Sequence, residues 1–155
     1  MRDFSDLLTP RAVRTGVSVP SRKALFTRLG QLADECWSLD AKKVSDLLHE
    51  REKLVTTGSG NGIAIPHARY TGLPHLVGAV LVLEKPIDFD AIDDMPVDLI
   101  FMLLTPPDAG SVHLKMLARV ARALRDQDYA DKLRGAGSDD ALFAILTGLE
   151  ARDAA

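Results

Sequence analysis

The feature that most constrains the fold is a nearly continuous apolar segment from Leu76 to Glu84, in the middle of the chain. A strand with one wet face alternates apolar and polar residues, whereas a strand buried on both faces reads as an unbroken apolar run. The segment is also far shorter than the roughly 20 apolar residues that a membrane-spanning helix needs. It therefore predicts a central strand of a sheet that other elements cover on both sides.

The rest of the chain predicts strands and helices around this central strand. Further strands are expected at Gly62–Ile65, at Val97–Thr105 and within residues 11–18. Apolar residues at helical spacing predict four helices. The first covers about 21–36 after the cap Ser21, and the second runs from the cap Asp40 to about Lys53. The third opens at Ser111 and the fourth begins at Ser138 and Asp139; the apolar side of the third contains Leu114, Leu117, Val120, Ala121 and Leu124. This order predicts an α/β fold with a mixed central β-sheet flanked by helices on both faces. We expect a single domain over 1–155, with its core at about 5–149.

Composition excludes several classes of protein. The 155 residues, of which 46% are hydrophobic and 26% charged, are typical of a globular domain with a sizeable core. A net charge of -3, with both signs scattered along the chain, forms no basic stripe, so we expect no nucleic-acid partner. The lone cysteine, Cys36, excludes an internal disulfide and a zinc–thiolate site. The N-terminus has no signal-peptide pattern, and we predict a cytoplasmic protein without membrane insertion.

The segment Gly58–Arg69 is the strongest candidate for a functional site. Its three glycines allow the main chain to approach a partner or an anion closely, and Pro66 fixes the backbone just before His67. We expect His67 at a defined exit from the sheet, where an uncharged imidazole is a competent nucleophile.

Other chemistries lack the residues that they need. The glycine segment is neither a dinucleotide fingerprint, since Ile63 stands where glycine or alanine is required, nor a P-loop, since no Gly-Lys-Ser/Thr follows. The pair His49–Glu50 lacks the second histidine of a zinc protease, and we assign both His49 and His75 to the surface. The acidic residues Asp90, Asp93, Asp94 and Asp98 are explained by turns and strand-edge solubility. We expect neither a metal nor a cofactor.

Four segments together resemble a known family, the enzyme IIA proteins of the bacterial phosphotransferase system, of the fructose, mannitol and nitrogen-regulatory kind. They are His49–Glu52, Gly60–His67, Phe89–Asp93 with Pro96–Leu99, and His113–Leu117. The resemblance is closest to the nitrogen-regulatory branch and covers nearly the whole chain. It implies that His67 accepts a phosphoryl group from a histidine-containing phosphocarrier protein, as tele-phosphohistidine, and passes the group on or holds it as a signal.

The resemblance also implies roles for residues whose own context is ambiguous. Arg51 lies in a charged stretch that is usually a solvated helix face, and His113 could simply cap its helix. By resemblance, Arg51 clamps phosphoryl oxygens with its guanidinium fork, and His113 hydrogen-bonds or orients the group. We expect the backbone of Gly60, Asn61 and Gly62 to supply further phosphate-binding N–H donors.

The function implied is that of a phosphoryl carrier and regulatory protein of the nitrogen-related system, a phosphotransferase component rather than a free-standing enzyme. Its phosphorylation state is expected to control partner proteins, with potassium-transport and sensor-kinase proteins implied by the resemblance. Two alternatives stay open: a sugar-specific IIA component that passes the group to a IIB domain, and a binding module that has lost phosphoryl transfer. Ala68, Arg69 and the loop Leu54–Thr57 depart from the family pattern, so partner choice stays open as well.

Overall fold

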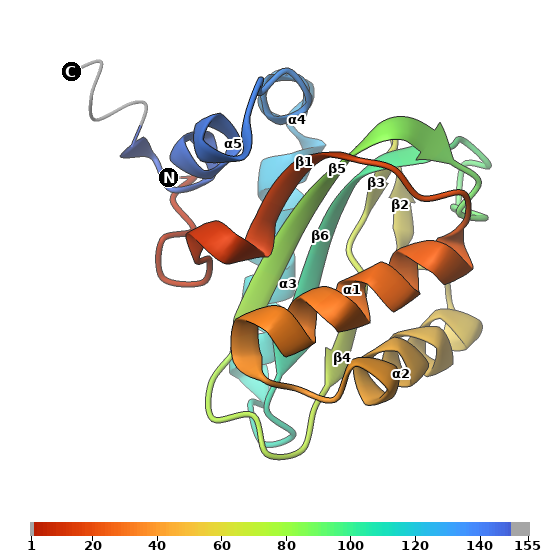
Figure 1. The fold of residues 1–155 in the computed structure, drawn as a ribbon, viewed down its shortest axis with the longest axis vertical. Helices are drawn as coiled ribbons and strands as arrows, with labels where there is room; N and C mark the ends of the chain where they lie inside the picture. Colours follow the sequence, from red (N-terminus) through yellow and green to blue (C-terminus); the bar gives the residue numbers. More distant parts are fainter. Residues whose placement is uncertain (1, 150–155) are drawn as a thin grey trace.

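The computed structural model describes residues 2–149, which form one mixed sheet between two layers of helices (Figure 1). The sheet contains six strands: β1 (Val13–Val17), β2 (Gly58–Gly60), β3 (Ile63–Ala64), β4 (His67–Arg69), β5 (Val77–Ile87) and β6 (Val97–Thr105). The helices are α1 (Arg22–Trp37), α2 (Ala41–Leu54), α3 (Ser111–Arg125), α4 (Gln127–Arg134) and α5 (Asp139–Leu146), and a 3-10 turn covers Pro10–Ala12. None of the helices between residues 2 and 149 has the length and hydropathy required to cross a membrane.

The strand order is β1-β5-β6-β3-β2, with β4 also paired to β6. The pairs β5–β6 and β2–β3 are antiparallel, whereas β1 runs parallel to β5, and β3 and β4 run parallel to β6. Strand β6 is therefore the centre of the sheet, and two separate short strands pair along its edge. The predicted mixed sheet, flanked on both faces, is confirmed.

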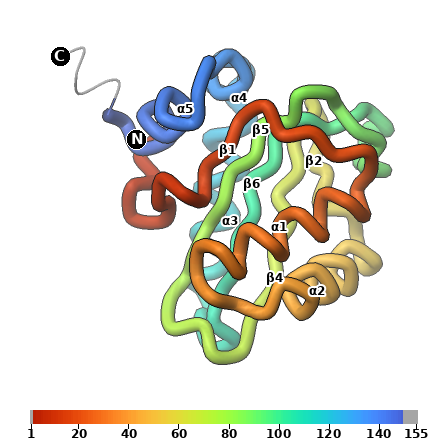
Figure 2. The backbone as a smooth tube through the Cα atoms, in the orientation of Figure 1, coloured from red at the N-terminus to blue at the C-terminus, as the bar shows by residue number. Residues whose placement is uncertain are grey.

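Alternate residues of β5 belong to two different apolar clusters, one on each face of the sheet, as the unbroken apolar run predicts. Ala79 and Leu81 pack into the cluster under α1 and α2, whereas Val80 and Val82 pack into the cluster under α3, α4 and α5. Figures 1 and 2 show α1 and α2 in front of the sheet and α3 behind it. Both faces of β5 are buried up to Leu83, so this strand can neither slip nor turn over without exposing one cluster.

The caps that the sequence indicates begin the helices. The side chains of Ser21, Asp40 and Ser138 accept hydrogen bonds from the backbone N–H three residues on, at the starts of α1, α2 and α5. Strand β6 has the predicted bounds, and β1 lies within the predicted range 11–18. The limits of the domain, expected at about 5 and 149, stay a prediction.

Two of our expectations for the helices were wrong. Helix α4 was not predicted, although Asp126 caps it by accepting from Asp128 N–H and Tyr129 N–H, and its Tyr129 and Leu133 are buried. Leu114, expected on the apolar side of α3, is exposed. A short helix such as α4 has too few turns for a periodic apolar pattern to be recognised. Leu114 is exposed because the first turn of α3 extends beyond the edge of the core.

The strand before His67 also differs from expectation. β3 contains only Ile63 and Ala64, and His67 is the first residue of β4 instead of lying beyond the end of a strand. Ile63 pairs with Leu99, and His67, four residues on, pairs with Leu103, so the register along β6 is unchanged. Pro66 has no N–H to add to the ladder, which separates one extended path into two short strands.

Candidate functional site

Both ring nitrogens of His67 have defined partners. Nδ1 lies 2.8 Å from the carbonyl oxygen of Ile65, and Nε2 accepts a hydrogen bond of 3.2 Å from Nε of Arg51. A carbonyl can only accept, so Nδ1 carries the proton and Nε2 keeps its lone pair. The surroundings therefore select one tautomer of the imidazole, with Nε2 as its nucleophilic atom.

Arg51 is held at the end of α2, beside the edge of the sheet that β4 forms. Its Nη1 donates to the carbonyl oxygen of Val55 at 2.8 Å, which fixes the guanidinium while its Nε faces His67. The side chain is only part-buried, so the remaining N–H groups are available to an incoming anion. A planar guanidinium in this position suits two oxygens of a phosphoryl group.

His113 approaches His67 from the opposite side of the sheet, in the first turn of α3. The two ring centroids are 5.4 Å apart and the ring planes are inclined by 56°. His113 is 7% exposed, and its buried Nδ1 has no hydrogen-bond partner. The helix cap residue Gly110 provides no side-chain hydrogen bond, so the first turn of α3, which carries His113, has no side-chain cap. Such a helix start stabilises a bound anion.

Burial and positive neighbours favour the uncharged form of both histidines. Burial is the main reason that the pKa of His67 lies below its usual value, and Arg51 adds to this effect, while the bond to Ile65 and the charge of Glu52 oppose it. Burial likewise lowers the pKa of His113, and His67, Arg69 and Arg51 lower it further. A neutral imidazole in a positive field is suited to attack an electrophile that carries negative charge.

Exposed apolar side chains surround these groups. We call the four residues Leu54, Val55, Val112 and Leu114 the apolar rim; their exposed fractions are 77%, 64%, 56% and 66%. Leu54 and Val55 follow Arg51 at the end of α2, and Val112 and Leu114 flank His113. Large apolar side chains exposed together around a polar centre mark a protein-binding surface.

The predicted phosphate-binding turn lies elsewhere. Asn61 and Gly62 connect β2 to β3, and the carbonyl of Gly62 accepts from Asp98 and Leu99 near the start of β6. His67 pairs with Leu103, four residues further along the strand, or roughly 13 Å away at the usual rise per residue. The structure therefore does not bring Gly60, Asn61 and Gly62 together with His67. Their positive φ angles of 101°, 58° and 79° serve the turn itself.

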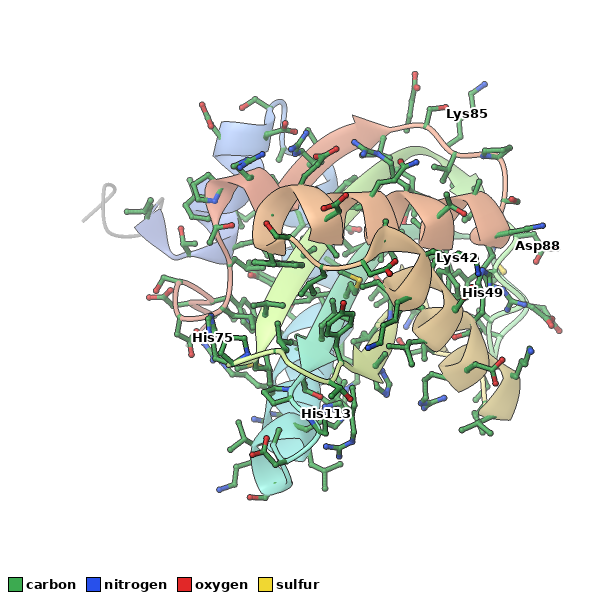
Figure 3. The ribbon with its side chains drawn as sticks, turned by 60° about the horizontal axis from the view of Figure 1, so that its bottom comes forward. Lys42, His49, His75, Lys85, Asp88 and His113 are labelled. Carbon is green, nitrogen blue, oxygen red and sulfur yellow. The ribbon has the colours of Figure 1, made fainter. Side chains whose placement is uncertain are left out.

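Within the described part of the chain, the remaining histidines and acidic residues form no second centre. Figure 3 shows His113 well apart from both His49 and His75. His75 is exposed as expected, but His49 is half-buried and packs against Phe26 with the ring centroids 4.7 Å apart, so its assignment to the surface was only partly correct. Within residues 2–149, no group of three histidine, cysteine or carboxylate side chains is placed to hold a metal ion.

Comparison with known proteins identifies the class of protein. Residues 6–148 match the family described as phosphoenolpyruvate-dependent sugar phosphotransferase system, EIIA 2. The chain belongs to this family.

Within the family, the similarity is to nitrogen regulatory proteins. The chain is 43% identical to that of Bradyrhizobium diazoefficiens over 92% of its own length and 94% of the relative's, and 41% identical to that of Pseudomonas aeruginosa over 95% and 96%. The crystal structure of nitrogen regulatory protein IIA-Ntr from Neisseria meningitidis superposes with a TM-score of 0.86 at 37% identity, over 92% of this chain and 97% of that one. The resemblance seen in the sequence is thereby confirmed.

The sequence alone did not reveal all of the residues around the site. Glu52 and Thr57 are buried next to Arg51, and both are connected to it through the turn that follows α2. Glu52 stood in the segment His49–Glu52 that carries the family resemblance, but its place in the charged stretch Glu50–Lys53 reads as a solvated helix face and gave no sign of burial. Nothing in the sequence predicted that Val112 and Leu114 are exposed, because apolar residues in the first turn of a helix are normally assigned to the core.

Proposed function

We propose that the protein is a phosphoryl carrier of the nitrogen-related phosphotransferase system, and that Nε2 of His67 accepts the phosphoryl group. The single observation that carries this proposal is the pair of contacts on the ring, Nδ1 to the Ile65 carbonyl and Nε2 to Arg51. They leave a lone pair on Nε2 inside a cationic and partly buried site. The donor is a phosphohistidine of the phosphocarrier protein of the system.

The transfer balances without a base. Nε2 attacks phosphorus in line, a P–N bond forms on His67, and the P–N bond of the donor imidazole breaks and returns its electron pair to that ring. The Nδ1 proton stays on His67, whose ring becomes cationic, and the Ile65 carbonyl at 2.8 Å stabilises that charge. Arg51 releases Nε2 and donates to phosphoryl oxygens instead, so the resting contact positions the arginine for its later role.

His113 and the start of α3 complete the site on the other side. The unpartnered Nδ1 of His113 and the start of α3, which has no side-chain cap, supply polar groups for the phosphoryl group. The apolar rim provides contact area for the phosphocarrier protein, whose own phosphohistidine must come within bonding distance of Nε2. Arg69, whose Nη1 donates to Pro107 at 3.0 Å, adds positive charge beside His113.

The output that we propose is regulatory. Phosphorylation places a phosphoryl group with about two negative charges, offset in part by the cationic ring, at the centre of the apolar rim, so proteins that bind this face discriminate between the two states. Potassium-transport and sensor-kinase proteins are the regulated targets that the family suggests. The cytoplasmic location belongs to the same proposal, since the donor is a cytoplasmic protein.

One experiment tests the site. The protein is incubated with phosphoenolpyruvate, enzyme I and the phosphocarrier protein; we expect one acid-labile phosphoryl group per chain, located on Nε2 by nuclear magnetic resonance. His67→Ala should incorporate none, while the matched control His75→Ala, at an exposed histidine, should match the unaltered protein. Equal incorporation into His67→Ala would contradict the assignment. Rapid onward transfer to a purified fructose or mannitol IIB domain would favour the sugar-specific alternative.

A further inference from the structure

Glu52 is a buried carboxylate that the proposed transfer does not use. Its side chain is 4% exposed, whereas that of Glu50, on the same turn of α2, is 71% exposed. A buried carboxylate is costly unless donors surround it. All of the hydrogen-bonding neighbours of Glu52 are donors from Thr56 and Thr57, and Nη1 of Arg22 lies 3.6 Å from Oε1.

These bonds hold the turn between α2 and β2. Oε1 accepts from the Thr56 hydroxyl at 2.8 Å, and Oε2 accepts from the Thr57 hydroxyl at 2.6 Å. The backbone N–H of Thr57 is shared between both oxygens at 3.0 Å each. The carboxylate thereby holds the side chain of Thr56 and both the side chain and the backbone N–H of Thr57, directly after Val55.

From this turn, one chain of hydrogen bonds leads to Nδ1 of His67. The carbonyl of Thr57 accepts from Ile65 N–H at 3.0 Å, and the carbonyl of Ile65 faces Nδ1 at 2.8 Å. A second chain leads to the other ring nitrogen. The carbonyl of Val55 accepts from Nη1 of Arg51 at 2.8 Å, and Nε of the same guanidinium contacts Nε2 at 3.2 Å. Both partners of the imidazole are therefore anchored to the turn that Glu52 holds.

We propose that Glu52 is the positioning residue of the phosphoryl-accepting histidine, because it fixes the turn Val55–Thr57 from which both ring nitrogens are oriented. This inference rests on the proposed function of His67 and deepens it. Glu52 does not touch the phosphoryl group, and it acts only through Thr57, Ile65 and Arg51. Its negative charge also raises the pKa of His67, against the lowering effects of burial and Arg51.

The test compares Glu52→Gln with the matched control Glu50→Gln. The amide keeps the size of the side chain but presents an NH2 group to donors, so the turn loses part of its anchor. We expect Glu52→Gln to lower the kcat of phosphorylation by the phosphocarrier protein about tenfold with little change in KM, since a small displacement of a reacting group has a large effect on rate. Glu50→Gln should leave both parameters unchanged.

Two spectroscopic readouts separate positioning from a loss of stability. In the unaltered protein, the 15N shifts of His67 should report a proton on Nδ1, and this tautomer should become mixed in Glu52→Gln. The pKa of His67 should fall in Glu52→Gln and not in Glu50→Gln, because a neighbouring negative charge is removed only in the first. A Glu52→Gln protein with unchanged rate, tautomer and pKa would overturn the inference even if it were less stable.

A second pair of variants keeps the test decisive if Glu52→Gln does not fold. Thr57→Val removes the hydroxyl that donates to Oε2, and Thr57→Ser retains it. We expect the first to slow transfer and shift the His67 tautomer, and the second to restore both. Equal rates in the two variants would overturn the inference. If the unaltered protein takes up no phosphoryl group at all, the proposed function itself fails, while the tautomer measurement still tests what Glu52 positions.

Discussion

The polar groups at the two ends of the central strand β6 differ in whether they have hydrogen-bond or ion-pair partners. At the end near Val97–Leu99, which we call the hairpin end, Asp98 and Arg134 are paired: Nε of Arg134 lies 2.9 Å from Asp98, and Nη2 of Arg134 donates to the Asn61 carbonyl at 2.7 Å. Asn61 N–H in turn donates to Asp93 at 3.0 Å. This end is closed, and its polar residues hold the β2–β3 turn in place.

At the end near Leu103–Thr105, which we call the histidine end, polar groups are left without partners. Among residues 2–149, the buried Nδ1 of His113 and the buried Oγ1 of Thr105 at this end make no hydrogen bond, and the buried hydroxyl of Tyr129 in α4 also makes none. Buried polar atoms are almost always paired, so the two unpaired atoms at the histidine end need an explanation. The contrast teaches that glycine and charge serve structure at the hairpin end, and the unpaired groups at the histidine end fit the proposed phosphoryl site.

The sharpest way to break this comparison is to remove one arginine from each end. Arg51→Ala should slow phosphorylation about 100-fold, equivalent to about 2.7 kcal/mol of transition-state stabilisation, because charge on the phosphoryl oxygens loses its main donor. Arg134→Ala should leave that rate unchanged and lower the free energy of unfolding by about 1–2 kcal/mol, since it breaks a partly shielded ion pair. Rapid-quench phosphorylation and urea unfolding measure the two quantities. A rate loss in Arg134→Ala would remove the distinction between the ends.

A glycine substitution tests whether the hairpin glycines are structural. Gly62 has a φ of 79°, and a Cβ at this position would lie 2.7 Å from Nη2 of Arg134. Gly62→Ala should therefore lower the free energy of unfolding by about 2 kcal/mol, from left-handed backbone strain and a displaced arginine. Gly16→Ala, with a φ of 66° and nothing within 4 Å, isolates the backbone strain at about 1 kcal/mol. If Gly62→Ala slowed phosphorylation of the folded protein, the turn would belong to the site after all.

The unpaired imidazole at the histidine end should have a moderate effect on rate. His113→Ala is expected to slow transfer about tenfold, or about 1.4 kcal/mol, because one hydrogen-bonding group beside the phosphoryl position is lost. The folded structure should persist, as judged by circular dichroism. An unchanged rate under single-turnover conditions would mean that His113 only fills space beside His67.

The smallest effect concerns pH. The pKa of His67 lies below 6.5, the usual value for histidine, so at pH 6.5 more than half of the molecules carry a neutral His67. The transfer rate at pH 6.5 should therefore exceed half of the rate at pH 8. Since the pKa values of His49, His67 and His113 are all lowered, the unfolded chain binds these protons at higher pH than the folded one. The free energy of unfolding should therefore fall as the pH drops below about 6.5. The transfer rate is measured by stopped flow over a series of pH values. If the rate fell to half of its pH 8 value while the pH was still above 6.5, the direction of the pKa shift would be contradicted.

Local patterns were sufficient to predict most of the fold. The apolar run at 76–84 and the segment 97–105 identified β5 and β6, and the caps Ser21 and Asp40 identified the starts of two helices, because these signals depend on neighbours in the sequence. Helix α4 was not predicted because it is too short to show a clear periodic pattern. The glycine turn was placed beside His67 because the two are only a few residues apart, but an extended chain covers roughly 3.3 Å per residue and carries them to opposite ends of β6.

The sequence by itself determined the layered α/β architecture, the family and the candidate histidine, since apolar periodicity, caps and a glycine-to-histidine motif are all local. Only the tertiary structure decided which atoms share the site. It brought Arg51 and His113 to the ring of His67 from two different helices, and it separated Gly60–Gly62 from that ring. It also decided that Nε2 carries the lone pair, because the tautomer depends on a carbonyl and a guanidinium whose positions are fixed by packing around Glu52.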